Sequence, residues 1–236
     1  MARVLQKDKV VVFTGAGVSA ESGIRTFRDS NGLWNEYLVE DVATPAAWQR
    51  NPELVLDFYN DCRQQMSSAK PNAAHDAIAR LEETHEVVVV TQNIDDLHER
   101  AGSSQVIHLH GEISKARSSL DETLIYDIGS QPLKKGDFCE LRSQLRPHIV
   151  WFGENIINYD EARNHVRNAA RILVIGTSLN VYPAAGLLKK ASFHAEKAIV
   201  SLEVDSVPFG YKFIRGKATN IVPRIVGDWM NGGRAF

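Results

Sequence analysis

The sequence predicts an α/β fold in which helices cover both faces of a doubly wound, mostly parallel sheet, with a small inserted subdomain. Several short apolar runs are continuous rather than alternating, as in strands buried on both faces. Helical patterns separate these runs, and small or polar residues follow each run. The 236 residues, of which 44% are hydrophobic and 24% charged, are enough for one large core. We therefore expect one domain of Rossmann-like type over residues 1–236.

Charge and cysteine content narrow the classes of partner. A formal net charge of -2 argues against nucleic acid as the main ligand. The two cysteines, Cys62 and Cys139, are too few for a disulfide framework or a four-cysteine zinc site. Charged residues interrupt the N-terminal region early, and no apolar run is as long as a membrane helix. We expect a cytoplasmic protein that binds neither nucleic acid nor a membrane; its oligomeric state stays open.

Four apolar runs are expected to form the strands of the sheet, at residues 10–13, 87–90, 172–175 and 198–202. The expected helices cover residues 53–66, 73–83, 95–101 and 160–170. The runs are followed in turn by the sequences TGAGVSAES, TQNID, GTSLN and EVDS. Open α/β sheets bind ligands at the carboxyl ends of their strands. The four polar turns therefore predict one composite site on that edge.

The turn after the first strand resembles a nucleotide-binding fingerprint with one glycine missing. Gly15 and Gly17 would let the backbone approach a pyrophosphate at the start of a following helix, but Ala20 stands at the third glycine position. The alternative is a tight turn that binds nothing. Glu36 and Glu40 follow no clear second strand, so the acidic partner of a hydride-transfer dehydrogenase is missing. A dehydrogenase is the least favoured enzyme class.

The second turn and the histidine pair supply candidate polar groups. Gln92, Asn93 and Asp95 cluster at a strand end; helix capping explains one of them, and together they suit a ribose or carboxamide partner. His108 and His110 lie two apart, so an extended chain places both on one face. A histidine suits general-base chemistry near neutral pH, but spacing alone does not choose between these two.

Two segments near the middle of the chain have no catalytic pattern of their own. Residues 146–154, RPHIVWFGE, form either a core strand and turn or an edge that pairs with an extended peptide. Residues 112–147 are rich in serine, lysine, aspartate and glycine with scattered apolar side chains. They predict a small inserted subdomain rather than a linker.

Five motifs, taken in order, resemble the sirtuins, which are NAD-dependent protein-lysine deacylases. They are GAGVSAESGIRTFR (15–28), TQNID (91–95), HLHGE (108–112), WFGE (151–154) and GTSLNVYPAAGL (176–187). The closest likeness is to the bacterial-type class III branch, with desuccinylase-like features. The resemblance implies that NAD is consumed as a co-substrate and that acyl-lysine peptides are the acceptors. The implied products are nicotinamide, O-acyl-ADP-ribose and free lysine.

The resemblance also implies roles for individual residues. It makes His110 the general base, with Asn93 and Asp95 beside it. The residues expected to contact NAD are Gly15, Ala16, Gly17, Ala20, Ile24, Phe27, Arg28, Gln92, Asn93, Ile94, Asp95, His110, Gly176, Thr177, Ser178, Ser201 and Ala218. Those expected to contact the substrate are Ala43, Tyr59, Cys62, Arg63, Val150, Trp151, Phe152, Gly153, Glu154 and Val181.

The chain departs from the family pattern at three places. The branch that removes acidic acyl groups carries an arginine three residues after the tyrosine matched by Tyr59; here that position is Cys62, and Arg63 is the candidate substitute on nearly the same helix face. The zinc-module segment has Cys139 alone, with Ser118 where a cysteine pair would begin, so we expect no structural zinc. Ser201 replaces a frequent asparagine near the adenosine.

Two rival functions use the same site. One is NAD glycohydrolysis or ADP-ribosyl transfer to another acceptor, against which the peptide motifs WFGE and NVYPA argue. The other is a non-catalytic sensor of NAD or ADP-ribose, against which the intact His110, Asn93 and Asp95 argue. A deacylase is the leading hypothesis.

Overall fold

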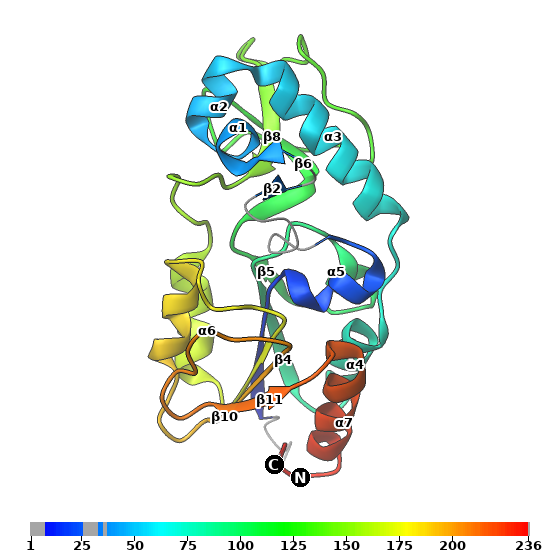
Figure 1. Ribbon diagram of the computed structural model, residues 1–236, viewed down its shortest axis with the longest axis vertical. Helices are drawn as coiled ribbons and strands as arrows, with labels where there is room; N and C mark the ends of the chain where they lie inside the picture. The colour runs from blue at the N-terminus through cyan, green and yellow to red at the C-terminus, as the bar shows by residue number, and fades with distance from the viewer. Residues whose placement is uncertain (1–7, 26–32, 35–36, 236) are drawn as a thin grey trace, which may run out of the picture.

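The computed structural model describes residues 8–25, 33–34 and 37–235, and its core is a six-stranded parallel sheet (Figure 1). The strand order is β11-β10-β9-β1-β4-β5, and every neighbouring pair is parallel. The strands are β1 (Lys9–Thr14), β4 (Glu86–Thr91), β5 (Val106–His108), β9 (Arg171–Ile175), β10 (Glu196–Ser201) and β11 (Lys212–Arg215). The predicted α/β class, doubly wound and mostly parallel, is confirmed.

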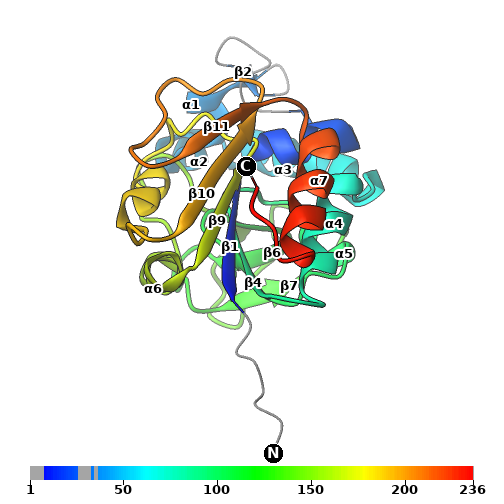
Figure 2. The ribbon, with the colours of Figure 1, turned by 90° about the horizontal axis from the view of Figure 1, so that it is seen from below.

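Alternate side chains of each central strand enter different cores, which explains the continuous apolar runs. In β1, Val10 and Val12 belong to one buried cluster, whereas Val11 and Phe13 belong to the other. The first cluster packs under α4 (Ala73–Leu81) and α7 (Ala218–Met230). The second packs under α6 (Tyr159–Asn168) and the 3-10 segment η3 (Ala184–Lys190). Figure 2 shows these helices on opposite faces of the sheet.

A smaller lobe lies above the carboxyl edge of the large sheet in Figure 1. Its elements are the hairpin β2 (Leu33–Trp34) and β3 (Tyr37–Leu38), the helices α1 (Val39–Val42), α2 (Pro45–Arg50) and α3 (Pro52–Ser68), and the antiparallel sheet β7-β6-β8, made of β6 (Gly111–Ser118), β7 (Ile125–Asp127) and β8 (Leu145–Ile149). Leu56 on α3, Ala116 on β6 and Leu133 form a buried cluster between α3 and the antiparallel sheet. Apolar contacts thus fasten the inserted segment to α3.

Several element boundaries differ from the expectations. The last predicted strand stops one residue early, at Ser201, and the next residue, Leu202, is 59% exposed. The helices begin or end within a few residues of the predicted bounds, as α5 (Leu97–Arg100) does. The helix expected after the glycine turn is replaced by two single 3-10 turns, η1 (Ala16–Val18) and η2 (Ala20–Ser22).

β5, β11 and α7 are among the elements that the sequence analysis did not predict. β5 is only three residues long, too short to carry a pattern, and β11 is half-exposed. α7 contains Pro223 and Gly227, which weaken a helix prediction. Its buried Val222, Ile225, Val226 and Trp229 nevertheless recur at helical spacing, and their packing on the sheet outweighs the local propensity. Among the described residues, no helix is both long and apolar enough to cross a bilayer.

Replacing Leu133 by alanine is expected to lower the free energy of unfolding by about 3 kcal/mol, because the substitution leaves a cavity in the cluster between the insert and α3. Urea unfolding of the two proteins measures this difference. Leu120→Ala is the matched control, since Leu120 is 73% exposed in the same insert. Equal losses in both variants would contradict the assignment of Leu133 to the core.

Candidate active site

The turns after β1 and β9 are joined backbone to backbone. Gly15 N donates to Ile175 O at 3.0 Å, and Gly17 N donates to Gly176 O at 2.8 Å. A Cβ on Gly17 would lie 2.7 Å from the Gly176 Cα, and a Cβ on Gly176, whose φ is +62°, would lie 2.3 Å from Val18 N. Only glycine permits this approach. The two turns therefore form one cradle of bare backbone at the carboxyl edge of the sheet.

A buried polar cluster lies next to this cradle, on the turn after β4. Ser19 Oγ donates to Asp95 Oδ2 at 3.0 Å and accepts from Asn93 Nδ2 at 3.2 Å. Asp95 Oδ1 accepts from the backbone N–H of Leu97 at 3.2 Å, and Leu97 is the first residue of α5. Burial raises the pKa of Asp95 to about 6, against the effect of these hydrogen bonds. The structure thus brings Asn93 and Asp95 together, as the sequence predicts.

Ser19, which the sequence analysis did not select, links the glycine turn to this cluster. It is fully buried although it lies in a polar turn. The signal that could have revealed it is a hydroxyl two residues after Gly17, within the glycine turn at the carboxyl end of β1. A second link joins the turns of β4 and β9, where Gln92 Nε2 donates to Thr177 Oγ1 at 3.3 Å.

The two candidate histidines are distinguished by their hydrogen bonds. His110 Nδ1 lies 2.9 Å from Gln92 O, so the proton resides on Nδ1 and Nε2 keeps a lone pair. Burial lowers the pKa of His110, so its imidazole is neutral at neutral pH. Nε2 has no hydrogen-bond partner among the described residues. His110 is therefore equipped to accept a proton.

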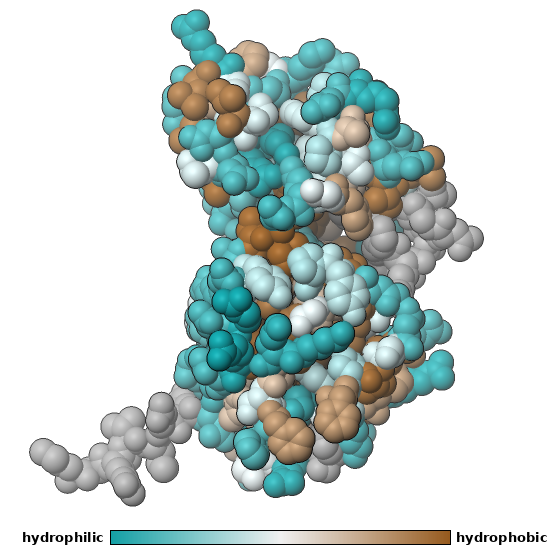
Figure 3. Space-filling model, turned by 90° about the vertical axis from the view of Figure 1, so that its left-hand side faces the viewer, coloured by the Kyte–Doolittle hydropathy of each residue, from teal (hydrophilic) through white to brown (hydrophobic). Residues whose placement is uncertain are grey.

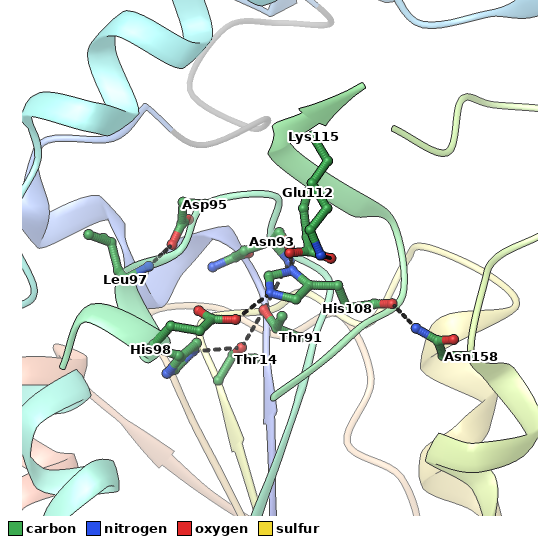
Figure 4. Close-up of polar contacts among 11 residues, drawn as sticks. Thr14, Thr91, Asn93, Asp95, Leu97, His98, His108, Glu112, Lys115 and Asn158 are labelled. Atoms are coloured by element: carbon green, nitrogen blue, oxygen red, sulfur yellow. Dashed lines mark hydrogen bonds and ion pairs between the residues drawn. The ribbon is translucent and has the colours of Figure 1, made fainter. Parts of the chain in front are cut away.

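His108 is held at both ring nitrogens (Figure 4). Nδ1 lies 3.0 Å from Asn93 O and Nε2 lies 2.8 Å from a carboxylate oxygen of Glu99. Burial alone lowers the pKa of His108, but the hydrogen bond and charge of Glu99 outweigh it and raise the pKa overall. Both nitrogens act as donors, so His108 is an ion-paired clamp that holds the Asn93 carbonyl.

The predicted acyl-recognition residues lie in one apolar cluster. Ala43, Tyr59 and Cys62 are buried there with Trp151, whose Nε1 donates to the Tyr59 hydroxyl at 3.1 Å. Burial raises the pKa of that hydroxyl, which stays protonated. Phe152 N donates to Ala43 O at 3.0 Å and joins the 151–154 turn to this cluster.

Arg63 is buried beside the same cluster and faces the small sheet. Its Nε donates to Ile113 O at 2.8 Å and its Nη1 to Asn60 Oδ1 at 2.6 Å. Nη2 is buried without a hydrogen-bond partner among the described residues. Burial lowers the pKa of Arg63 to about 10, so the guanidinium remains charged at neutral pH. One nitrogen of this cation therefore lacks an acceptor among the described residues.

The turn at residues 151–154 is fixed by an ion-pair network. The Glu154 carboxylate accepts from Arg146 at 2.7 and 3.1 Å, from Arg117 at 3.2 Å and from Trp151 N at 2.8 Å. Glu154 therefore shapes the turn, and the 49% exposed Phe152 lies at its tip. In Figure 3 the surface narrows between the two lobes, and hydrophobic side chains gather at that waist.

The remaining predicted site residues are more scattered. Ile24 and Ile94 are buried in the cluster around Tyr59, and Val150 N donates to His110 O at 2.9 Å. Ser201 Oγ donates to Glu203 O at 2.8 Å, and Ala218 packs in the core at the start of α7. The positions around the cradle and the peptide segment are half-buried or exposed: Ala16, Ala20, Gly153, Ser178 and Val181. Phe27 and Arg28 lie outside the described residues.

The small sheet carries no donor set that fits zinc. Cys139 Sγ lies 3.3 Å from Ser143 Oγ and 3.5 Å from Ser118 Oγ, and these two hydroxyls are 2.6 Å apart. Among the described residues, no group of three or more histidine, cysteine or acidic side chains could hold a metal ion. One thiol and two hydroxyls do not supply the four ligands of a structural zinc site. Hydrogen bonding with the Ser143 and Ser118 hydroxyls lowers the pKa of Cys139 to about 7.

Comparison with known proteins identifies the family. The fold and the edge site define a Rossmann-like α/β protein, and the model of the Sir2 family matches residues 15–183. The chain belongs to the Sir2 family. It is 49% identical over 196 residues to an NAD-dependent protein deacylase of Helicobacter pylori, covering 83% of each chain. It is 44% identical over 239 residues to one of Escherichia coli, covering 98% of this chain and 85% of the relative.

Solved structures agree with this assignment. A complex of a Sir2 homologue with NAD has a TM-score of 0.82 at 38% identity, covering 96% of this chain and 90% of the other. A Sir2 protein bound to an acetylated peptide has a TM-score of 0.79 at 31% identity, covering 94% of each chain.

Glu99→Gln is expected to lower the pKa of His108 and to destabilise the protein more at pH 5.5 than at pH 9. The pKa of His108 is raised by folding, so the stability it contributes is present below its unfolded pKa and is lost as the pH rises through its folded pKa. Urea unfolding at both pH values measures the effect. Glu83→Gln, on an exposed side chain, is the control. A loss that is equal at both pH values would refute the ion pair.

Proposed function

We propose that the chain is an NAD-dependent protein-lysine deacylase that produces nicotinamide, O-acyl-ADP-ribose and free lysine. Its relatives named NAD-dependent protein deacylases support this proposal. The observation that carries it is the state of His110. Its imidazole is neutral with the proton on Nδ1, and its Nε2 has no hydrogen-bond partner among the described residues. Its Nδ1 donates to the carbonyl of Gln92, the residue before Asn93, which belongs to the buried cluster with Ser19 and Asp95. A general base needs this combination of protonation state and position.

The described residues fit NAD as a co-substrate. At Gly15, Gly17 and Gly176 a Cβ would collide with the facing turn, so the two turns stay in close backbone contact at the sheet edge, where the proposal places a phosphate group of NAD. In this proposal Asn93, Asp95 and the Ser19 hydroxyl bind the nicotinamide ribose, and Ser201 and Ala218 lie toward the adenosine. NAD supplies the electrophilic ribose carbon when it is bound. The role proposed for His110 is to take a ribose hydroxyl proton on Nε2.

The acceptor is proposed to be an acyl-lysine peptide that lies along residues 150–154 and Val181. The likeness to a Sir2 protein bound to an acetylated peptide supports an acyl-lysine peptide as the acceptor. The N–H groups of Val150, Trp151 and Phe152 are already bonded within the chain. In this proposal an extended peptide therefore pairs with the other backbone groups of this segment, as in β-strand addition. We propose that the acyl chain enters the apolar cluster of Tyr59, Ala43 and Trp151.

We propose that this pocket prefers acetyl over succinyl. A carboxylate is best recognised by two parallel N–H bonds from one arginine. Arg63 already uses Nε on Ile113 O and Nη1 on Asn60, so a succinyl carboxylate would receive bonds from Nη2 alone. Desuccinylation is therefore a secondary activity in this proposal.

The chain is proposed to act in the cytoplasm as a single catalytic domain, with residues 112–147 as its insert.

Incubation with NAD and acetyl-lysine peptide is expected to yield nicotinamide, O-acetyl-ADP-ribose and free lysine peptide in equal amounts. Mass spectrometry measures the three products. His110→Gln is expected to lose about 10²-fold or more in kcat, because it removes the general base. His165→Gln is the control, since His165 lies on α6. NAD loss without peptide change would favour the glycohydrolase instead, and no turnover would favour the sensor.

Cys62→Arg is expected to raise the succinyl-to-acetyl ratio of kcat/KM at least tenfold, because it restores an arginine three residues after Tyr59. Competition between matched acetyl and succinyl peptides measures the ratio. Cys62→Met, which fills the same buried position without charge, controls for altered packing. A wild-type enzyme that removes succinyl faster than acetyl would overturn the proposed preference.

We also propose that the insert folds without zinc. Purified protein is expected to contain well under one zinc per chain, and an excess of chelator is expected to leave its melting temperature unchanged. The physical reason is that hydrogen bonds among Ser118, Ser143 and Cys139 connect the two ends of the insert, and Leu133 supplies apolar contact. Elemental analysis and thermal melts test this. Stoichiometric zinc would contradict it.

A further inference from the structure

Two histidines lie buried behind the candidate site, and the proposed function gives neither a role. His75 is the third residue of α4 and His98 the second of α5, and their side chains are 0% and 1% exposed. Their ring centroids are 4.8 Å apart at an angle of 61°. Figure 4 shows His98 beside Thr14, below the turn that carries Asn93.

The hydrogen bonds of His98 fix the position of its proton. Thr14 Oγ1 donates its own proton to Thr91 Oγ1 at 2.8 Å. The contact of 3.1 Å between Thr14 Oγ1 and His98 Nε2 therefore needs a proton on Nε2. Burial lowers the pKa of His98 well below its ordinary value, so the ring is neutral and Nδ1 holds a lone pair. That Nδ1 is buried without a partner among the described residues.

A hydrogen bond likewise fixes which ring nitrogen of His75 carries the proton. The backbone N–H of Asn72 donates to His75 Nδ1 at 3.3 Å, as part of the capping box of α4. Nδ1 is therefore unprotonated, and the proton resides on Nε2. Burial lowers the pKa of His75 to about 4, so this ring is also neutral at pH 7. Its Nε2 is buried without a partner among the described residues.

One ring thus has an unpaired donor and its neighbour has an unpaired acceptor. Leaving either group unsatisfied costs about 1–3 kcal/mol. We propose that His75 Nε2–H donates to His98 Nδ1 through one buried water, since neither nitrogen reaches a partner directly among the described residues, and that the pair are positioning residues for the turn at Asn93. The link completes a chain that runs from Asn72 through both rings to Thr14 and Thr91. Every donor in it points the same way, which strengthens each bond.

The chain connects both sides of the candidate site. At its far end Thr91 Oγ1 accepts from the backbone N–H of Asn93 at 3.0 Å and so fixes where the chain leaves β4. At its near end the Asn72 side chain donates to Val18 O and to Ser22 Oγ, each at 2.9 Å, which holds the glycine turn. The effect on turnover rests on the proposed deacylase function. The hydrogen-bond chain itself does not.

Nitrogen-15 NMR of the imidazoles in the full chain at pH 7 tests the chain without any assay of activity. Both His75 and His98 are expected as the Nε2–H tautomer, with the His98 Nδ1 signal shifted by an accepted hydrogen bond. Loss of one signal set in His75→Gln and of the other in His98→Gln assigns them. An Nδ1–H tautomer or an imidazolium at either residue would overturn the proposal.

Steady-state kinetics test the positioning role. Thr14→Val removes the hydroxyl at nearly constant shape and is expected to lower kcat about tenfold, with the peptide KM within about twofold. His98→Leu is expected to do the same, whereas His98→Gln, which can both donate and accept, keeps most of kcat. Thr84→Val is the control, since the Thr84 hydroxyl bonds to Leu81 O and His85 Nδ1 and, within the described part of the chain, to no residue of the site. Wild-type kcat in Thr14→Val, or His98→Gln as slow as His98→Leu, would refute it.

Discussion

The contact between two glycine turns is the constraint on which the site depends. The strand order places β1 between β4 and β9, so the turn after β1 lies where the chain switches direction across the sheet. Gly17 and Gly176 bring two of these turns into backbone contact, and Gly176 N also donates to Val200 O at the end of β10. Backbone hydrogen bonds alone therefore fix the ends of β1, β9 and β10 relative to one another.

The side chains of the site are arranged by buried hydrogen bonds that begin at these strand ends. The histidines show this most clearly. His108 and His110 contact two successive carbonyls, Asn93 O and Gln92 O, but only His108 meets an acidic partner. The same residue type is therefore held as a charged clamp in one position and as a neutral base in the other. In the small lobe, Glu154 forms a similar structural ion pair, with Arg146 and Arg117.

Local patterns in the sequence predicted the central strands, because a strand buried on both faces is continuously apolar. The turn residues Asn93 and Asp95 were predicted for a similar reason, since polar groups at strand ends stand out. The direction of Arg63 toward Ile113 and the pairing of His108 with Glu99 were not predictable. Both depend on partners that only the folded chain brings close. Ser19 was missed because its burial is set by its contact with Asp95.

The central claim is that the two interlocked turns form the NAD cradle, and calorimetric titration of NAD into Gly176→Ala tests it most directly. A Cβ at Gly176 would force the turns apart, so the account predicts at least about a tenfold loss of NAD affinity. Gly227→Ala, in α7 with open space around the added Cβ, is predicted to bind NAD as the wild type does. Unchanged affinity in a folded Gly176→Ala protein would contradict the account.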